Sequence, residues 1–175
     1  MLRAAIVVGH GGISWEMTRQ LVDHLPVMVV PHWATTRTQP IALADIVRLL
    51  VGVLEPEQAR GQTYEVGGPD VLTYAEMMQR VSKIVKNRTL PMLAVPLLTP
   101  RLSSHWLSFV TDVDTQTARN LIDSMNNEVV VTDHSIDEVV PGRSMSYDDA
   151  VREALRQRAE SQAETTADSE APAAT

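Results

Sequence analysis

Short apolar runs alternate along the chain with longer segments in which apolar residues recur at helical spacing. Runs of four to seven residues are predicted as strands at 2–8, 27–30, 63–66 and 128–132. Short apolar runs such as the first are typical of strands buried on both faces of a parallel sheet. Between the runs, periodicity predicts helices over 13–25, 45–54 and 74–85. Strands and helices that alternate in this way predict an α/β fold.

Capping patterns indicate where several helices begin. Thr73 and Glu76 form the Thr-x-x-Glu pattern of a capping box, with Leu72 and Met77 placed as its hydrophobic staple. Asp45 is predicted to cap the helix that continues through Leu54 rather than to act as an acid. Later helices are predicted to start after Thr99, Asp114, Ser135 and Ser146.

The chain of 175 residues is expected to form one body and one tail. Residues 157–175 contain Ala, Glu, Ser, Thr and Pro but no large apolar side chain. Such a segment cannot bury enough surface to offset the entropy of ordering. The prediction is therefore a folded domain over 1–156 followed by a disordered acidic tail over 157–175.

Composition excludes several functional classes. The formal net charge of −7 argues against a nucleic-acid binder, which needs a basic face. The chain has no Cys, so disulfides and thiolate chemistry are excluded, and its His residues lack the spacing of a metal site. No apolar run reaches the roughly 20 residues that span a bilayer, and no signal-peptide pattern is present. A cytoplasmic protein without metal, membrane span or nucleic-acid partner is expected.

A glycine-rich loop, Gly9-His10-Gly11-Gly12, joins the first predicted strand to the first predicted helix. Such a loop lets backbone N–H groups at a helix start approach a pyrophosphate. The match to G-x-G-x-x-G is loose, because Ser14 stands at the third position and no acidic residue ends the second strand. The alternative is an ordinary loop in which His10 is exposed.

Six stretches of the sequence share the pattern of one protein family. They are Leu2–Gly9, Leu25–Trp33, Arg37–Asp45, Tyr64–Tyr74, Leu98–Trp106 and Asn127–Val131. Through them, the segment 2–133 resembles the C-terminal part of atypical, extended short-chain dehydrogenase/reductases, nearest to the NAD(P)H-binding, NmrA-like branch. That family has a G-x-x-G-x-x-G loop after its first strand and a catalytic Tyr-x-x-x-Lys pair. Neither is present here, because no tyrosine of this chain has a lysine four residues on.

The resemblance implies a partial Rossmann-type fold, its C-terminal, substrate-binding portion, with NAD or NADP as cofactor. It places Gly9, His10 and Gly11 near the nicotinamide end, and it places the substrate pocket at Trp33, Arg37, Gln39 and Trp106. For Arg37, binding of a carboxylate or phosphate and a solvated or structural role stay open. It implies no catalytic residue in this chain, and only weak cofactor binding, or none, is expected of the chain alone.

Three functions remain open from the sequence. The first is an oxidoreductase-like protein present as its C-terminal half. The second is a non-catalytic NmrA-like module that binds a small molecule or regulates a partner, and the third is an inactive truncated remnant. In each case the missing half would supply the central strands of the sheet. The segment Leu2–Val8 is therefore expected to present an unpaired edge to a second copy or another chain.

Overall fold

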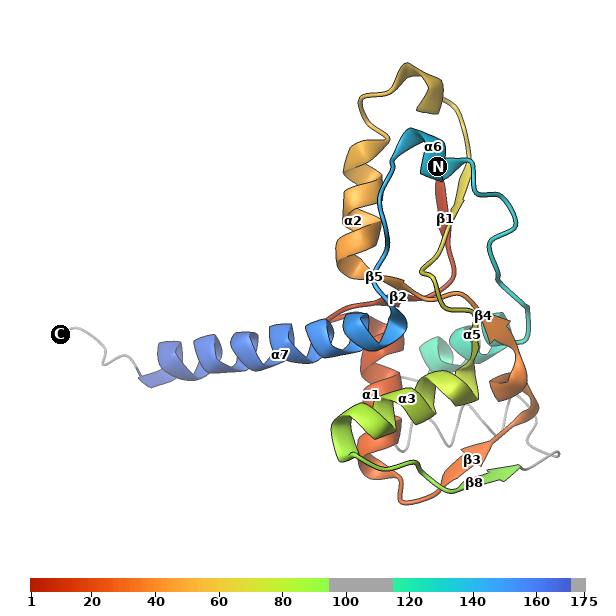
Figure 1. Cartoon of the computed structure of the whole chain (residues 1–175). Coiled ribbons are helices and arrows are strands. Elements are labelled where there is room, and N and C mark those ends of the chain that lie inside the picture. The colour runs from red at the N-terminus through yellow and green to blue at the C-terminus, as the bar shows by residue number, and fades with distance from the viewer. Residues whose placement is uncertain (95–114, 171–175) are drawn as a thin grey trace.

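A computed structural model describes residues 1–94 and 115–170. The strands are β1 (Leu2–Ala4), β2 (Val7–Val8), β3 (Met28–Val30), β4 (Arg37–Thr38), β5 (Ile41–Ala42), β6 (Tyr64–Val66), β7 (Leu72–Thr73) and β8 (Met92–Ala94). The helices are α1 (Ile13–His24), α2 (Leu43–Gly52), α3 (Tyr74–Lys86), α5 (Thr115–Met125), α6 (Ile136–Val139) and α7 (Tyr147–Glu170). Two 3₁₀ turns, η1 (His32–Thr35) and η2 (Glu57–Ala59), complete the described elements (Figure 1). The α/β prediction is confirmed.

The strands pair as short two-stranded units, three of them parallel. β1 pairs with β6, β2 with β5 and β3 with β8 in parallel, while β4 and β7 are antiparallel. The predicted first strand is split into β1 and β2, and Arg3 and Ala4 are exposed. The prediction of burial on both faces is therefore wrong for β1, whose Leu2 is only half-buried. β6 is its one strand neighbour among the described residues, so its other edge is unpaired there. The predicted strand over 128–132 is reduced to a single bridge between Val129 and Thr38.

The main hydrophobic core lies where α1, α3 and α7 meet (Figure 1). Trp15, Val22, Val81 and Val151 are almost fully buried there. A second cluster lies under α2, around Ile41, Leu49, Tyr64, Val66 and Ile136. The last helix turns Val151 and Ala154 into this core, where both are buried, and Leu155 packs against it.

Local capping predictions are confirmed where both partners lie within one turn. The Glu76 backbone N–H donates to Thr73 Oγ1 at 3.2 Å, and the Thr73 backbone N–H donates to Glu76 Oε2 at 2.7 Å. At the start of α7, the Asp149 backbone N–H donates to Ser146 Oγ at 3.2 Å. Both caps satisfy backbone donors that a helix start otherwise leaves without partners, and the Thr73–Glu76 pair is a full capping box.

The prediction that Asp45 caps α2 is wrong. α2 begins at Leu43, and Ala42 at its N-cap makes no side-chain hydrogen bond. Asp45 lies in the first turn, buried, and its Oδ2 accepts the Met145 backbone N–H at 2.8 Å. Asp70 Oδ2 accepts the Tyr147 backbone N–H at the same 2.8 Å. Asp45 and Asp70, here called the aspartate clamp, thus fasten the start of α7 to the body.

Helix α7 differs from the predicted tail. It continues to Glu170, so residues 157–170 are helical in the structure and extend away from the body (Figure 1). The side chains of residues 162–166 are exposed, whereas Arg158 still reaches Glu16 on α1 at 3.4 Å. Within the parts of the chain that are described, no helix combines the length and hydropathy needed to cross a membrane. The division into a domain over 1–156 and a tail stays a prediction.

Two further helix predictions have different outcomes. The helix predicted after Thr99, and Asp114 as a cap, lie outside the described residues. The helix predicted over 115–125 is confirmed as α5. The turn predicted after Ser135 is confirmed as α6, but the Ser135 side chain makes no cap hydrogen bond, and Asp133 Oδ1 accepts the Ser135 backbone N–H instead.

Candidate functional site

The glycine-rich loop after β2 is a tight turn that contacts α2. A Cβ added to Gly9 would lie 2.5 Å from Leu43 Cβ, so only glycine allows this approach. Gly11 has φ of 79°, in the left-handed region that favours glycine. The Gly12 backbone N–H donates to the Gly9 carbonyl at 3.2 Å and is thereby used within the turn. Turn geometry accounts for these glycines without a ligand.

An acidic group stands at the start of α1, where a pyrophosphate would bind. Glu16 lies in the first turn, and its Oε1 is 3.7 Å from His10 Nδ1. Its Oε2 contacts Arg19 Nε at 3.0 Å and Arg158 Nη1 at 3.4 Å. A carboxylate at a helix N-terminus complements the helix dipole. Glu16 is paired there with two arginines, and a cofactor role of Gly9, His10 and Gly11 stays a proposal.

Trp33, a predicted pocket residue, is part of the core. It is 5% exposed, and its ring meets the Tyr74 ring edge to face, with centroids 6.1 Å apart. Trp33 borders a cavity of about 10 Å³ that is also lined by Met17, Leu21, Tyr74, Met77, Met78 and Met125. Space of this size holds at most one water molecule. Among the described residues, Trp33 therefore acts as a packing residue, and its role toward a substrate stays a proposal.

Arg37 and Gln39 both carry polar groups, but they lie in different surroundings. The Arg37 side chain is 57% exposed and pairs with Glu128 at 3.5 Å. Gln39 is buried, and its amide is fully engaged. Its Nε2 donates to the Gly68 carbonyl at 2.7 Å, and its Oε1 accepts the Val131 backbone N–H at 2.9 Å. Gln39 therefore links the loop after β6 to the 129–131 segment, whereas Arg37 pairs with Glu128 at the surface.

The predicted pocket residues are not brought together among the described residues. Gln39 lines a larger cavity, which neither Trp33 nor Arg37 borders. Trp106 lies outside the described residues. Gly9, His10 and Gly11 form the loop after β2 and do not border that cavity either.

The larger cavity has a volume of about 520 Å³, which is within the range of small-molecule sites. It opens at the carboxyl end of β6, where Gly67, Gly68 and Pro69 follow the strand. Its polar lining comes from Gln39, Glu65, His134, Asp137, Arg143 and Ser144. The sequence analysis predicts a helix start after Ser135 but no ligand site within 134–144. The Gly-Gly-Pro that follows β6 is the one local pattern in the sequence that points to this cavity.

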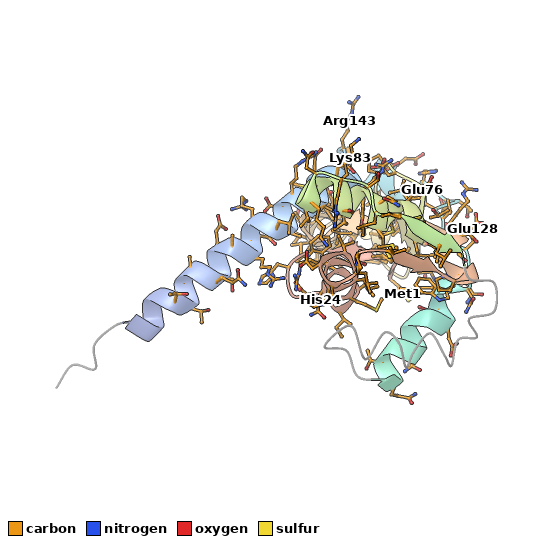
Figure 2. All side chains as sticks on the ribbon, turned by 90° about the horizontal axis from the view of Figure 1, so that it is seen from below. Met1, His24, Glu76, Lys83, Glu128 and Arg143 are labelled. Carbon is orange, nitrogen blue, oxygen red and sulfur yellow. The ribbon has the colours of Figure 1, made fainter. Side chains whose placement is uncertain are left out.

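The charges around this cavity have mixed sign. Glu65 Oε2 accepts the Thr132 backbone N–H at 2.7 Å, the Thr132 hydroxyl at 3.0 Å and the Asp133 backbone N–H at 3.2 Å. These donors, the Thr132 backbone first, hold the pKa of Glu65 below its ordinary value. Arg143 is exposed and extends outward from the body (Figure 2). The lining suits a small polar molecule, with Arg143 able to meet an anionic group at the rim.

All three tyrosines of the chain are buried. Tyr64, Tyr74 and Tyr147 are 6%, 8% and 3% exposed. The Tyr147 hydroxyl donates to the Met77 carbonyl at 3.4 Å. Burial raises the pKa of Tyr74 and of Tyr147, which makes both phenols poorer acids. None of the three lines the larger cavity.

Known proteins share the fold but little sequence. The sequence matches no family model. Seventy-three residues are 30% identical to NADH dehydrogenase (ubiquinone) 1 alpha subcomplex subunit 9, a mitochondrial protein of Arabidopsis thaliana. That match covers 41% of this chain and 17% of the subunit.

Solved structures match over nearly the whole chain. UDP-glucose 4-epimerase from Thermotoga maritima has a TM-score of 0.60 at 11% identity, over 92% of this chain and 46% of the epimerase. An NADPH-dependent quinone oxidoreductase from Escherichia coli has a TM-score of 0.62 at 13% identity, over 77% of this chain and 48% of that protein. The chain has a Rossmann-type fold. It spans about half the length of the solved proteins that it resembles.

A third neighbour is UDP-glucuronic acid 4-epimerase from Bacillus cereus, solved with UDP-glucuronic acid and NAD. Its TM-score is 0.57 at 11% identity, over 89% of this chain and 43% of the epimerase. The expected partial Rossmann-type architecture is thereby confirmed at the level of the fold. The assignment to the NmrA-like branch stays a prediction.

Proposed function

We propose that the chain is an oxidoreductase-like protein of the short-chain dehydrogenase/reductase superfamily that forms the substrate side of a nicotinamide-dependent fold. The observation that carries this proposal is the fold match, which includes 92% of this chain and 46% of an epimerase. By the family resemblance, the loops after β2 and β6 would lie on the substrate side, and the part of the fold that this chain lacks would hold the cofactor loop and the proton donor.

The surroundings of the tyrosines support a chain without its own proton donor. Hydride transfer to a carbonyl needs an acid at the reacting oxygen, and the acid must lie within hydrogen-bond reach. Tyr74 and Tyr147 are buried with raised pKa, and none of the three tyrosines has a lysine four residues on. The chain alone is therefore expected to bind a ligand without turning it over.

A second candidate is a non-catalytic binding module, and the cavity at the end of β6 favours it. Its volume of about 520 Å³ suits a small polar ligand, and its lining includes His134, Arg143 and Ser144. A module of this kind would work without the missing half. Both candidates predict that the chain alone does not turn over a substrate. They differ in whether the chain needs the missing half of the fold in the cell.

Cofactor titration tests whether the chain alone binds a nicotinamide dinucleotide. NADH and NADPH are titrated calorimetrically into the wild-type chain, Gly11→Ala and Gly61→Ala. Gly11 and Gly61 have φ of 79° and 73°, and a Cβ added at either position would meet no atom within 4 Å. Both alanine variants therefore carry the same kind of backbone strain and no steric clash. We expect binding no tighter than about 1 mM, or roughly −4 kcal/mol, and equal in all three proteins. Micromolar binding that Gly11→Ala abolishes and Gly61→Ala keeps would contradict the proposal.

The coding sequence upstream of Met1 and the mass of the native protein distinguish the two candidates. We expect the coding sequence upstream of Met1 to continue in frame through a Tyr-x-x-x-Lys pair, and the native protein to have a mass above 19.3 kDa. A stop codon there, with a stable native protein of 19.3 kDa, would instead support the binding module.

A further inference from the structure

An irregular segment between α5 and α6 forms part of the wall of the larger cavity (Figure 1). Residues 130–134, here called the strap, have no regular secondary structure. Val131 of the strap lines the larger cavity and also a second cavity of about 100 Å³. The two cavities have four lining residues in common, which are Gln39, Glu65, Val66 and Val131. The strap therefore contributes to a wall that two neighbouring cavities share.

Both ends of the strap adjoin residues that are fixed to the body. Before it, the Val129 carbonyl accepts the Gln39 backbone N–H at 3.0 Å, and the Val129 backbone N–H donates to the Arg37 carbonyl at 3.2 Å. After it, Ile136 at the start of α6 is 4% exposed and belongs to the second hydrophobic cluster. Movement of the strap can thus take place between two anchored positions.

Two side chains of the body hold the middle of the strap. Gln39 Oε1 accepts the Val131 backbone N–H at 2.9 Å. Glu65 Oε2 accepts the backbone N–H groups of Thr132 and Asp133 and the Thr132 hydroxyl, at 2.7, 3.2 and 3.0 Å. Thr132 and Asp133 are themselves exposed. A segment that is held by solvent-exposed hydrogen bonds and buries few apolar side chains opens at a low free energy.

The attachment at Glu65 also contains a repulsion between like charges. The Asp133 carboxylate raises the pKa of Glu65, against the donors from Thr132 and Asp133 that lower it. Asp133 is held in place by the Ser135 backbone N–H, which donates to its Oδ1 at 2.9 Å. The hydrogen bonds that close the strap are therefore partly offset by a charge that the strap itself carries. Such a balance suits a segment that opens and closes.

We propose that the strap is a lid over the cavity at the end of β6 and that Glu65 is its latch. Release of the latch would open the wall that the two cavities share and join them into one groove. It would also uncover Val66, which is 2% exposed and lines both cavities. Lids of this kind control when a ligand enters and leaves a site. The inference concerns access to the cavity and rests on the second candidate function.

Thiol labelling under native conditions measures the opening of the strap. The chain has no Cys, so Val66→Cys introduces a single thiol behind the latch. The matched control is Val81→Cys, because Val81 is 0% exposed, lies in the main core and lines neither cavity. We expect Val66→Cys to react with a thiol reagent at least about tenfold faster than Val81→Cys, since local opening requires less free energy than global unfolding. Circular dichroism confirms that each variant is folded.

Changes to the latch should alter the labelling rate of Val66→Cys in opposite directions. Glu65→Ala should raise it at least about tenfold, because three donors lose a charged acceptor. Asp133→Asn should lower it, because the substitution removes the like charge and keeps an oxygen for the Ser135 N–H. Glu138→Ala, which removes an exposed carboxylate of α6, should leave the rate unchanged.

Three results would overturn the proposal. They are a Val66→Cys rate that Glu65→Ala leaves unchanged, a rise that is equally large in Val81→Cys, and faster labelling in Asp133→Asn. The Asp133→Asn arm decides the matter even where Glu65→Ala fails to fold. Labelling needs neither ligand nor cofactor, so its failure would refute the lid and leave the dinucleotide titration as the separate test of the proposed function.

Discussion

Replacing Asp45 with Ala is expected to loosen the start of α7 from the body. The substitution removes the acceptor of the Met145 backbone N–H, which lies 2.8 Å from Asp45 Oδ2. It also removes the partner of Arg48, at 3.4 Å. The residue is 5% exposed, so water cannot readily take the place of the carboxylate.

The magnitude follows from these two contacts. A hydrogen bond to a charged group contributes about 1.5–3 kcal/mol. The Arg48 pair adds less than about 1 kcal/mol, because the Arg48 side chain is 34% exposed and screened by solvent. We therefore expect Asp45→Ala to lower the free energy of unfolding by about 2–3 kcal/mol. At about 2–4 °C per kcal/mol for a chain of this size, Tm falls by roughly 5–10 °C.

Urea unfolding and amide hydrogen exchange provide the measurements. The matched control is Glu57→Ala, which removes the carboxylate of another i,i+3 pair, with Arg60 at 3.9 Å and both side chains largely exposed. That control should change stability by less than about 0.5 kcal/mol. In Asp45→Ala the Met145 amide should also exchange faster. A loss below about 1 kcal/mol with unchanged exchange at Met145 would refute the role of the clamp.

Three further predictions concern local features. Thr73→Ala should cost about 1 kcal/mol in urea unfolding, because it removes the cap of α3, whereas Thr63→Ala at an exposed position should be silent. Removing residues 159–175 should leave Tm unchanged within error, since the described side chains at 162–166 are exposed, and a clear fall would show that the segment docks. Glu65 stabilises the fold above its ordinary pKa of 4.5 and loses that effect as pH falls through its lowered pKa, so wild type and Glu65→Gln should differ at pH 7 and converge in acid. A difference that persists at low pH would exclude the carboxylate as its source.

The features that the sequence predicts correctly depend on near neighbours. Thr73 and Glu76 are three residues apart, as are Ser146 and Asp149, so each cap is complete within one short segment. Asp45 has the residue type of a cap, but its partner Met145 lies 100 residues further along the chain. No local pattern carries information on a contact of that separation.

α7 continues as a helix through residues 157–170, where a disordered tail is predicted, because of local helix propensity. Residues 157–175 contain no large apolar side chain to bury, which is why a disordered tail is predicted there. Ala, Glu, Gln and Arg are strong helix formers, and a helix already started by Ser146 propagates through them at little cost. Arg156 adds side-chain pairs with Glu153 at 2.6 Å and Glu160 at 2.5 Å. Local propensity, rather than packing, extends this helix.

The candidate site was predictable only in part. The resemblance identified Gln39, and Gln39 lines the larger cavity, although both of its polar atoms are used by backbone partners. The other wall of the cavity comes from 134–144, whose residues show no periodicity and approach β6 only through the fold. Trp33 was predicted as a pocket wall, but a large aromatic side chain fits a core equally well, and the structure places it there.

The aspartate clamp also bears on how the chain folds as it is synthesised. Asp45 and Asp70 leave the ribosome long before Met145 and Tyr147, the residues whose backbone they bind. Until α7 emerges, Asp45 and Asp70 lack their backbone donors, and the core still lacks Val151 and Ala154. Such an intermediate exposes apolar surface and is prone to association. A translational pause before Tyr147 would therefore prolong this intermediate, whereas a further domain fused after α7 would not.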